Sequence, residues 1–174
     1  MRTLVVNTTL PVSEKSGNVF SAELPDNYVF LLGDTVSIVP ADGITNNCWP
    51  LGKDNKYIPY KSDTLEATVE TIDRQLENSL SEHNLKYCKA KPLRLIQGKN
   101  VMLYTDGSYK PSTYSITYLK KPSKIDLHTN PRSEFNEMPA HTHSEIVMLA
   151  VQMYLENQAN NRYQTYTNEV SIME

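Results

Sequence analysis

The residues with the clearest chemical potential are two histidines, His141 and His143, which stand two positions apart. On an extended segment, two imidazoles at this spacing can share a metal ion, and Glu145 would add a carboxylate oxygen. The surrounding pattern, however, starts a helix here, where polar side chains commonly satisfy backbone groups. No third histidine lies nearby, and a helical histidine pair four residues apart with a glutamate is missing. The sequence therefore predicts no metal site and no cofactor.

Catalysis by a nucleophile would need a serine or cysteine held beside a base, and the sequence has no motif that guarantees this arrangement. The Gly-x-Ser-x-Gly pattern is absent, and pairing of Cys48 or Cys88 with His83 or His128 would be a coincidence of folding. The 6 glycines of the chain form neither a phosphate-binding loop nor a dinucleotide turn. We therefore predict that the protein is not an enzyme.

Nucleic-acid binding is the main alternative that the residues support. Residues 86–124 contain nine basic residues against one acid, Asp106, and they are interleaved with tyrosines at positions Tyr87, Tyr104, Tyr109, Tyr114 and Tyr118. Basic residues mixed with exposed aromatic rings are typical of surfaces on which single-stranded bases stack. A two-sided sheet would alternate tyrosines and lysines in the same way, with the lysines in water. Both interpretations of this segment stay open at the level of sequence.

Two helices and a group of strands are predicted to position these residues. Residues 63–80 predict an amphipathic helix with an acidic outer face, because apolar side chains recur every three or four positions: Leu65, Val69, Ile72, Leu76 and Leu80. Residues 90–121 alternate apolar and polar side chains with a period of two, which predicts a β-meander. Residues 142–158 predict a second helix with a broad apolar face, whose expected core positions are Ile146, Leu149, Ala150, Met153 and Tyr154.

Both helices carry the spacing of a capping box at their expected starts, Asp63 with Glu66 and Thr142 with Glu145. The other segments predict extended or irregular chain: an arm or strand over residues 1–23, a long loop over 40–60, and a docking tail over 160–174. Together these elements indicate an α+β protein, a small antiparallel β-sheet or partial barrel packed against two main helices. We expect residues 1–174 to form a single domain.

Composition excludes several classes of protein. The chain has 174 residues and a net charge of −3, so no overall basic field attracts nucleic acid. No apolar run approaches the roughly 20 residues of a membrane helix, and the N-terminus lacks the pattern of a secretory signal. The 2 cysteines stand 40 positions apart without a Cys-x-x-Cys motif, which favours reduced, half-buried thiols and synthesis in a cytoplasm.

Charge is strongly segregated along the chain. Residues 62–85 carry six acidic side chains against Arg74 alone, and residues 86–124 reverse this sign. Such blocks are usually solvated faces, but their alternation also suggests that an acidic element meets a basic one, within the chain or between copies. Eleven tyrosines, a long loop and a polar, aromatic tail are features of a protein whose surfaces contact other proteins.

Several stretches resemble a family of virion proteins of the crAss-like bacteriophages. They are residues 24–32 (LPDNYVFLL), 90–95 (AKPLRL), 114–122 (YSITYLKKP) and 141–147 (HTHSEIV), the last continuing through 149–157 and 162–169. The similarity is to a ring protein of the head-to-tail connector, which lies below the portal, and more distantly to the head–tail adaptors of podoviruses. It covers most of the chain from about residue 20 onward, with the exception of the loop at 40–60.

The resemblance implies a structural protein that forms a ring of identical subunits, twelve by analogy. Such a ring would join the portal to neighbouring neck or tail proteins and line the channel through which double-stranded DNA passes without sequence specificity. The implied location is the head–tail interface of the virion, with the host cytoplasm as the place of assembly. A single-stranded nucleic-acid-binding protein that uses residues 86–124 is the alternative function.

A closed ring requires one patch of each subunit to meet a different patch on the next copy. We hypothesise that the acidic face of residues 63–80 meets the lysine-rich sheet of the neighbouring copy, through Glu66, Glu70, Asp73, Lys89, Lys91, Lys120 and Lys121. A second hypothesis is that the C-terminal tail docks onto the portal or the next ring, through Arg162, Tyr163 and Tyr166.

Overall fold

The computed structural model describes residues 4–44, 49–124, 128 and 137–157, and it divides the chain into two compact units. One unit comprises Val5–Lys121, and the other comprises Met1–Leu4 together with Pro122–Glu174. The expectation of one domain over residues 1–174 stays a prediction, since this division concerns contacts within the chain. The fold class is α+β, as predicted: the described residues form two sheets and two helices, one of them long.

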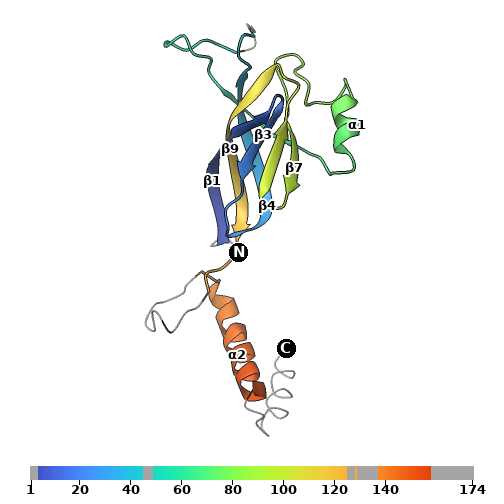
Figure 1. Ribbon diagram of the computed structural model, residues 1–174. Helices are drawn as coiled ribbons and strands as arrows, with labels where there is room; N and C mark the ends of the chain where they lie inside the picture. The colour runs from blue at the N-terminus through green and yellow to red at the C-terminus, as the bar shows by residue number, and fades with distance from the viewer. Residues whose placement is uncertain (1–3, 45–48, 125–127, 129–136, 158–174) are drawn as a thin grey trace. The chain divides into compact units, whose positions relative to one another are not determined.

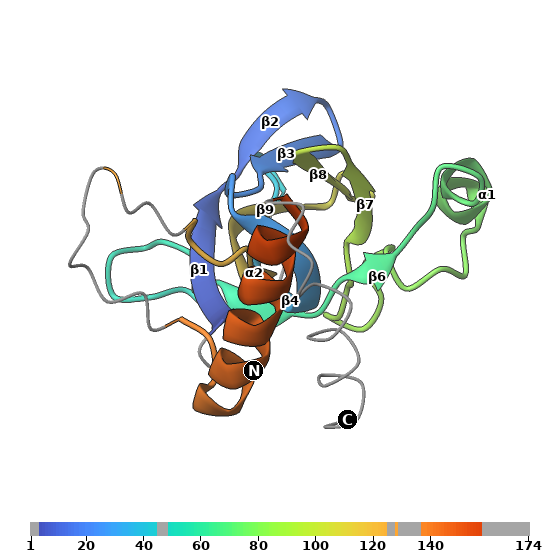
Figure 2. The same ribbon diagram turned by 90° about the horizontal axis from the view of Figure 1, so that it is seen from below.

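The unit Val5–Lys121 contains two sheets, whose strand orders are β1-β9-β4-β5 and β2-β3-β8-β7-β6. All strand pairs are antiparallel except β6 with β7. Figure 2 shows β6 to the side of the other strands, with α1 beyond it. The bounds are β1 Val5–Pro11, β2 Ser13–Ser16, β3 Val19–Glu23, β4 Tyr28–Pro40, β5 Tyr60–Ser62, β6 Leu65–Glu66, β7 Leu93–Gln97, β8 Asn100–Tyr104 and β9 Tyr109–Lys120 (Figure 1).

Strands rather than a free arm account for residues 5–23. β1 pairs with β9 along its whole length, and β3 pairs with β8, so the start of the chain contributes a strand to each sheet. Alternation along β1 places Leu10 in the core while Thr9 faces outward and contacts Ser115. Of the two expectations for residues 1–23, arm or strand, the described residues support the strand.

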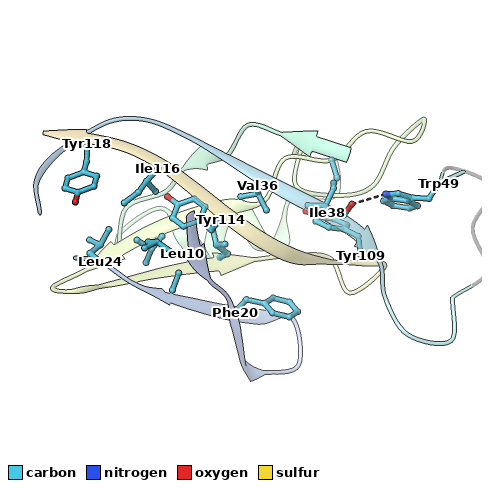
Figure 3. Close-up of a cluster of buried hydrophobic side chains, with 14 residues drawn as sticks. Leu10, Phe20, Leu24, Val36, Ile38, Trp49, Tyr109, Tyr114, Ile116 and Tyr118 are labelled. Atoms are coloured by element: carbon cyan, nitrogen blue, oxygen red, sulfur yellow. Dashed lines mark hydrogen bonds between the residues drawn. The ribbon is translucent and has the colours of Figure 1, made fainter. Parts of the chain in front are cut away.

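The core lies between the inner faces of the two sheets. Strands of the first sheet contribute Val36, Ile38, Tyr114 and Ile116, and those of the second contribute Phe20, Val101 and Leu103 (Figure 3). Several of these side chains are fully buried. Trp49 comes from the loop at 40–60, is 2% exposed, and donates a hydrogen bond from Nε1 to the carbonyl oxygen of Ile38. This buried indole ties the long loop to the sandwich.

The β-meander predicted over residues 90–121 is correct for its first two strands only. β7 and β8 form a hairpin around Gly98, whose φ of +60° suits glycine at this tight turn. β9 then leaves this sheet and pairs with β1 and β4 of the other one. A period of two identifies strands but does not say which sheet they join, because both sheets bury alternate side chains against the same core.

The helix predicted over residues 63–80 is wrong for most of its length. Residues 65–66 form β6 beside β7, and the amide of Ala67 donates to the carbonyl oxygen of Arg94. The helix α1 covers only Ile72–Glu77, and it follows Thr71 rather than the expected capping box at Asp63. Pairing with a strand edge satisfies backbone groups that the helix would otherwise have bonded internally, so tertiary contacts override the helical period.

The second helix is confirmed at its predicted position. α2 covers His143–Asn157, close to the expected 142–158, and a short 3₁₀ turn, η2, covers Ala140–Thr142 before it. The predicted capping box is not formed in the expected way. The Thr142 hydroxyl donates to the carbonyl oxygen of Pro139 at 2.8 Å and so closes the 3₁₀ turn. Neither α1 nor α2 is long and apolar enough to cross a membrane.

Candidate assembly surfaces

Most side chains of α2 are exposed, although the sequence predicted a helix core. None of its residues is buried: Ile146, Leu149, Met153 and Tyr154 are 39%, 49%, 64% and 63% exposed, and Ala150 is exposed as well. The expectation that these five residues form a core stays a prediction, because the described residues show no contact that covers them. Val147 and Val151, 61% and 39% exposed, widen the apolar surface. An amphipathic pattern indicates that a helix needs a partner, but it does not identify the molecule that supplies it.

Between Glu145 and Glu156, polar residues occupy only a narrow stripe of α2. At 100° per residue, Glu145, Gln152 and Glu156 fall within about 40° of one another, and apolar side chains cover most of the remaining circumference. Large apolar residues therefore stand on both flanks of the polar stripe. A helix of this type has room for two apolar contacts, one on each side.

The histidine pair at the start of α2 has no metal-binding arrangement around it. His143 Nε2 lies 3.1 Å from the carbonyl oxygen of Met138, which agrees with the interpretation of a polar side chain satisfying a backbone group. Across the described ranges, no three His, Cys, Asp or Glu side chains gather closely enough to hold a metal ion. Of His141, His143 and Glu145, His143 therefore contacts the backbone of the preceding segment.

The tyrosines of residues 86–124 do not form an open stacking surface. Tyr109, Tyr114 and Tyr118 are 1%, 0% and 3% exposed and lie in the core of the sandwich. Burial raises the pKa of Tyr109 and of Tyr114 far above the ordinary value, so both hydroxyls remain protonated donors. Tyr104 is half-buried, and Tyr87 is 99% exposed. Four of the five tyrosine rings are therefore buried or half-buried, as in an ordinary two-sided sheet, and Tyr87 is the exception.

The proposed acidic and basic interface residues are spread over the surface, and several already have partners within the chain. Lys91 pairs with Glu82 at 2.8 Å, which raises the pKa of Lys91 and lowers that of Glu82. Glu66 lies 3.5 Å from Arg94. Glu70, Asp73, Lys89 and Lys121 are exposed, whereas Lys120 is half-buried at the end of β9. The structure thus does not gather the seven residues into one helix face and one sheet face.

The sequence pattern does not predict the ion pair that joins the two sheets. Arg94 Nη1 of β7 lies 2.8 Å from Asp34 Oδ1 of β4, and the two side chains are only 11% and 8% exposed. Asp34 Oδ2 also accepts hydrogen bonds from the hydroxyls of Thr64 and Tyr114. This buried cluster lies where the parallel pairing of β6 ends. The one signal in the sequence is a charged residue placed between the apolar run at 28–32 and the strand at 35–39.

A shallow groove follows the part of β4 that β5 does not pair with. It has a volume of about 290 Å³ and is lined by Phe30, Leu32, Arg94 and Ile96, among others. Phe30 and Leu32 are 63% and 53% exposed, and β5 covers β4 only from Val36 to Ile38. Unpaired strand edges with exposed apolar side chains are unusual in a protein that acts alone. The groove is therefore a second surface that another chain is able to cover.

The expectation of reduced, half-buried cysteines is wrong for Cys88, which is disulfide-bonded and exposed. The separation of two cysteines in sequence does not determine their distance in space, so the sequence did not predict the disulfide bond. Cys48, the other cysteine of the chain, lies outside the described residues. The tail candidates Arg162, Tyr163 and Tyr166 also lie outside them.

Comparison with known proteins adds no assignment. Neither the protein-family models nor the curated proteins contain a match to this sequence.

Proposed function

We propose that the protein is a structural, non-enzymatic virion component that forms a ring in the head–tail connector of a tailed bacteriophage. The ring would join the portal to neighbouring neck or tail proteins and surround the DNA channel. The resemblance of residues 24–32, 90–95, 114–122 and 141–147 to connector ring proteins supports this proposal. The exposed apolar surfaces of the chain support it independently, because such surfaces are typical of proteins that associate with other chains.

The observation that carries the proposal is the uncovered apolar surface of α2. Six large apolar side chains of this helix are between 39% and 64% exposed: Ile146, Val147, Leu149, Val151, Met153 and Tyr154. Removing such side chains from water is favourable by roughly 25 cal/mol per Å², so association with other chains is the expected outcome. Apolar residues on both flanks of the polar stripe suit a ring, in which each subunit contacts two neighbours.

The test is the mass of the purified protein in solution, measured by light scattering and followed by negative-stain imaging, with and without the portal protein. We expect a closed ring near twelve subunits, formed either alone or on the portal. Leu149→Asp and Met153→Asp, which place a charge on the apolar flank, are expected to abolish the ring. Gln152→Asp introduces the same charge on the polar stripe and is expected to leave the ring intact.

Two results would count against the proposal. One is a protein that remains monomeric in the presence of the portal, and the other is a ring that tolerates both flank substitutions. Circular dichroism of each variant shows whether the helix is still present, so that loss of the ring is not mistaken for loss of folding. Deletion of residues 162–174 tests the tail separately: we expect the fold to survive and portal binding to weaken.

Single-stranded nucleic-acid binding is not proposed as a second function. That alternative depended on a row of accessible tyrosines, and three of the five rings are in the core. An oligonucleotide titration at two salt concentrations would detect such binding, since contacts to phosphates weaken steeply with salt.

A further inference from the structure

A tight turn between α1 and β7 presents the most exposed large side chain of the described residues. Lys86 and Lys89 form a two-residue hairpin, in which the amide of each donates to the carbonyl oxygen of the other at 2.9 and 2.8 Å. The two central residues, Tyr87 and Cys88, have φ values of +49° and +63°. Positive φ at both central positions is the geometry of a type I′ turn, for which asparagine and glycine are the favoured residues.

The occupants of this turn are therefore unfavourable ones. A bulky residue such as tyrosine is strained at positive φ, and Tyr87 adopts this conformation beside Cys88, which is disulfide-bonded. Tyr87 is 99% exposed, so the strain is not offset by burial of its ring within the chain. A tyrosine in this position therefore costs stability through its backbone and recovers none through its ring.

The body of the protein nevertheless holds the turn firmly. On one side, the amide of Leu85 donates to Asp106 Oδ2 at 2.7 Å. On the other side, Ala90 is 3% exposed, and its amide donates to the Tyr60 hydroxyl at 3.1 Å. A strained conformation persists only where its surroundings determine it, and it is often kept for a functional contact. Residues 86–89, called the tip below, thus project one aromatic ring between two lysines from a fixed base.

The same chain offers a complementary surface in residues 69–80, called the acidic segment below. It exposes two aliphatic side chains, Val69 at 62% and Leu80 at 81%. The same segment exposes the carboxylates of Glu70, Asp73 and Glu77, with Arg74 as its one basic residue. A segment that exposes aliphatic and acidic side chains is complementary to an aromatic ring that stands between two lysines. Since Tyr87 is almost fully exposed, its ring does not pack against the acidic segment of its own chain.

We infer that the tip is an anchor that docks onto the acidic segment of a neighbouring copy of this chain. The inference rests on the proposed assembly of identical subunits and names one contact within it. Because the tip and the acidic segment are different patches, the contact is heterologous, as a ring requires. Tyrosine is among the residues that most often dominate the binding energy of an interface. The lysines beside Tyr87 would orient the approach through complementary charge.

The decisive variant is Tyr87→Asn, which places a favoured residue in the turn. We expect its melting temperature to rise by about 2–4 °C, since relief of about 1 kcal/mol of strain shifts a protein of this size by that amount. We expect association between copies, followed by sedimentation velocity over a dilution series, to weaken at least about tenfold. A substitution that stabilises the fold and weakens assembly is not explained by misfolding. Tyr87→Phe keeps the ring and is the matched control, with association expected to stay near that of the unaltered protein.

A second experiment identifies the surface that the tip contacts. A benzophenone amino acid at position 87 is photo-activated in a mixture of isotopically light and heavy chains. We expect crosslinks between light and heavy chains that map to residues 69–80. Lys86→Glu with Lys89→Glu should weaken association, and Glu70→Lys with Asp73→Lys should restore it in the same chain.

Unchanged association of Tyr87→Asn, or crosslinks that map elsewhere, would overturn the inference. If rings form equally well in both proteins, the proposed function stands and only the contact is wrong. If the unaltered protein forms no ring even on the portal, the proposed function fails as well. Salt-dependent binding of an oligonucleotide that is lost in Tyr87→Asn would instead assign the tip to nucleic acid and would also overturn the inference.

Discussion

At the scale of single residues, His83 is a buried histidine whose imidazole the fold keeps from charging. It is 2% exposed, and its Nδ1 atom has no hydrogen-bond partner within the described part of the chain. Burial lowers the pKa of His83 below its ordinary value of 6.5, the nearby Asp106 carboxylate opposes this shift, and Lys86 adds to it. The carbonyl oxygen of the same residue accepts the Tyr109 hydroxyl at 2.7 Å, which fixes the segment before the tip against the sandwich.

Because the folded pKa of His83 is depressed, the unfolded chain takes up a proton at higher pH than the folded one. Stability from the neutral imidazole is therefore present above pH 6.5 and is lost as pH falls through this value toward the folded pKa. We expect urea denaturation between pH 8 and pH 5 to show a decline of up to about 1.4 kcal/mol per pH unit, the limit for one proton. His83→Gln should flatten this decline. Equal slopes for both proteins would show that other groups control it.

The ion pair of Arg94 and Asp34 gives a second prediction at this scale. Arg94→Met removes one partner and leaves the Asp34 carboxylate at 8% exposure without its cation. We expect a loss of about 3–5 kcal/mol in the free energy of unfolding, measured by urea denaturation at pH 7. Lys99→Met is the matched control, since its partner Asp26 stands in water with 90% of its side chain exposed. A similar loss for both variants would mean that the buried pair has no special role.

At the scale of elements, the two predicted helices fared differently for a physical reason. The period of apolar residues identified α2 close to its observed bounds, His143–Asn157. Residues 63–80 show the same period, yet β7 offers an open edge, and Leu65–Glu66 pair with it. The period of a sequence shows where apolar side chains recur. It does not show whether the backbone amides and carbonyls bond within a helix or to a neighbouring strand. The strands, the long loop and the fold class were predictable, whereas the assignment of strands to sheets was not.

The candidate surfaces divide in the same way. Composition identified the acidic and basic blocks, and many of their charged side chains are exposed in the structure. Composition did not reveal that Lys91 forms an ion pair within the chain. The position of Tyr87 in the sequence did not predict its exposure. A strained turn residue is recognised from its φ angle, which the neighbouring residue types do not reveal. The ion pair of Arg94 with Asp34 was not predictable from sequence either, because 60 positions separate the two residues.

The prediction at this scale compares two residues of the supposed apolar stripe. Ile72 of α1 is 7% exposed and packs with Ala67 and Leu93, whereas Val69, three positions earlier, is 62% exposed. We expect Ile72→Ala to lower the free energy of unfolding by about 2–4 kcal/mol, because it leaves a cavity. Val69→Ala should change it by less than about 0.5 kcal/mol. Equal losses in urea denaturation would instead support a continuous helix over residues 63–80 with both side chains in its buried face.

At the scale of the whole molecule, the division into two units separates folding from assembly. Every buried side chain of the main core lies between Leu10 and Tyr118, inside the unit Val5–Lys121. The described part of the other unit contains α2, none of whose residues is buried. Every residue of the main core therefore precedes Pro122, while α2 exposes large apolar side chains.

This separation predicts that a chain ending at Lys121 folds by itself and fails to assemble. The truncated protein should unfold in one cooperative transition, with a melting temperature within a few degrees of that of the full chain. It should also sediment as a monomer under conditions in which the full chain forms rings. Loss of the cooperative transition would show that residues 122–174 are needed to complete the core. Rings of undiminished size from the truncated chain would show that contacts of the sandwich, such as the tip, are sufficient for assembly without α2.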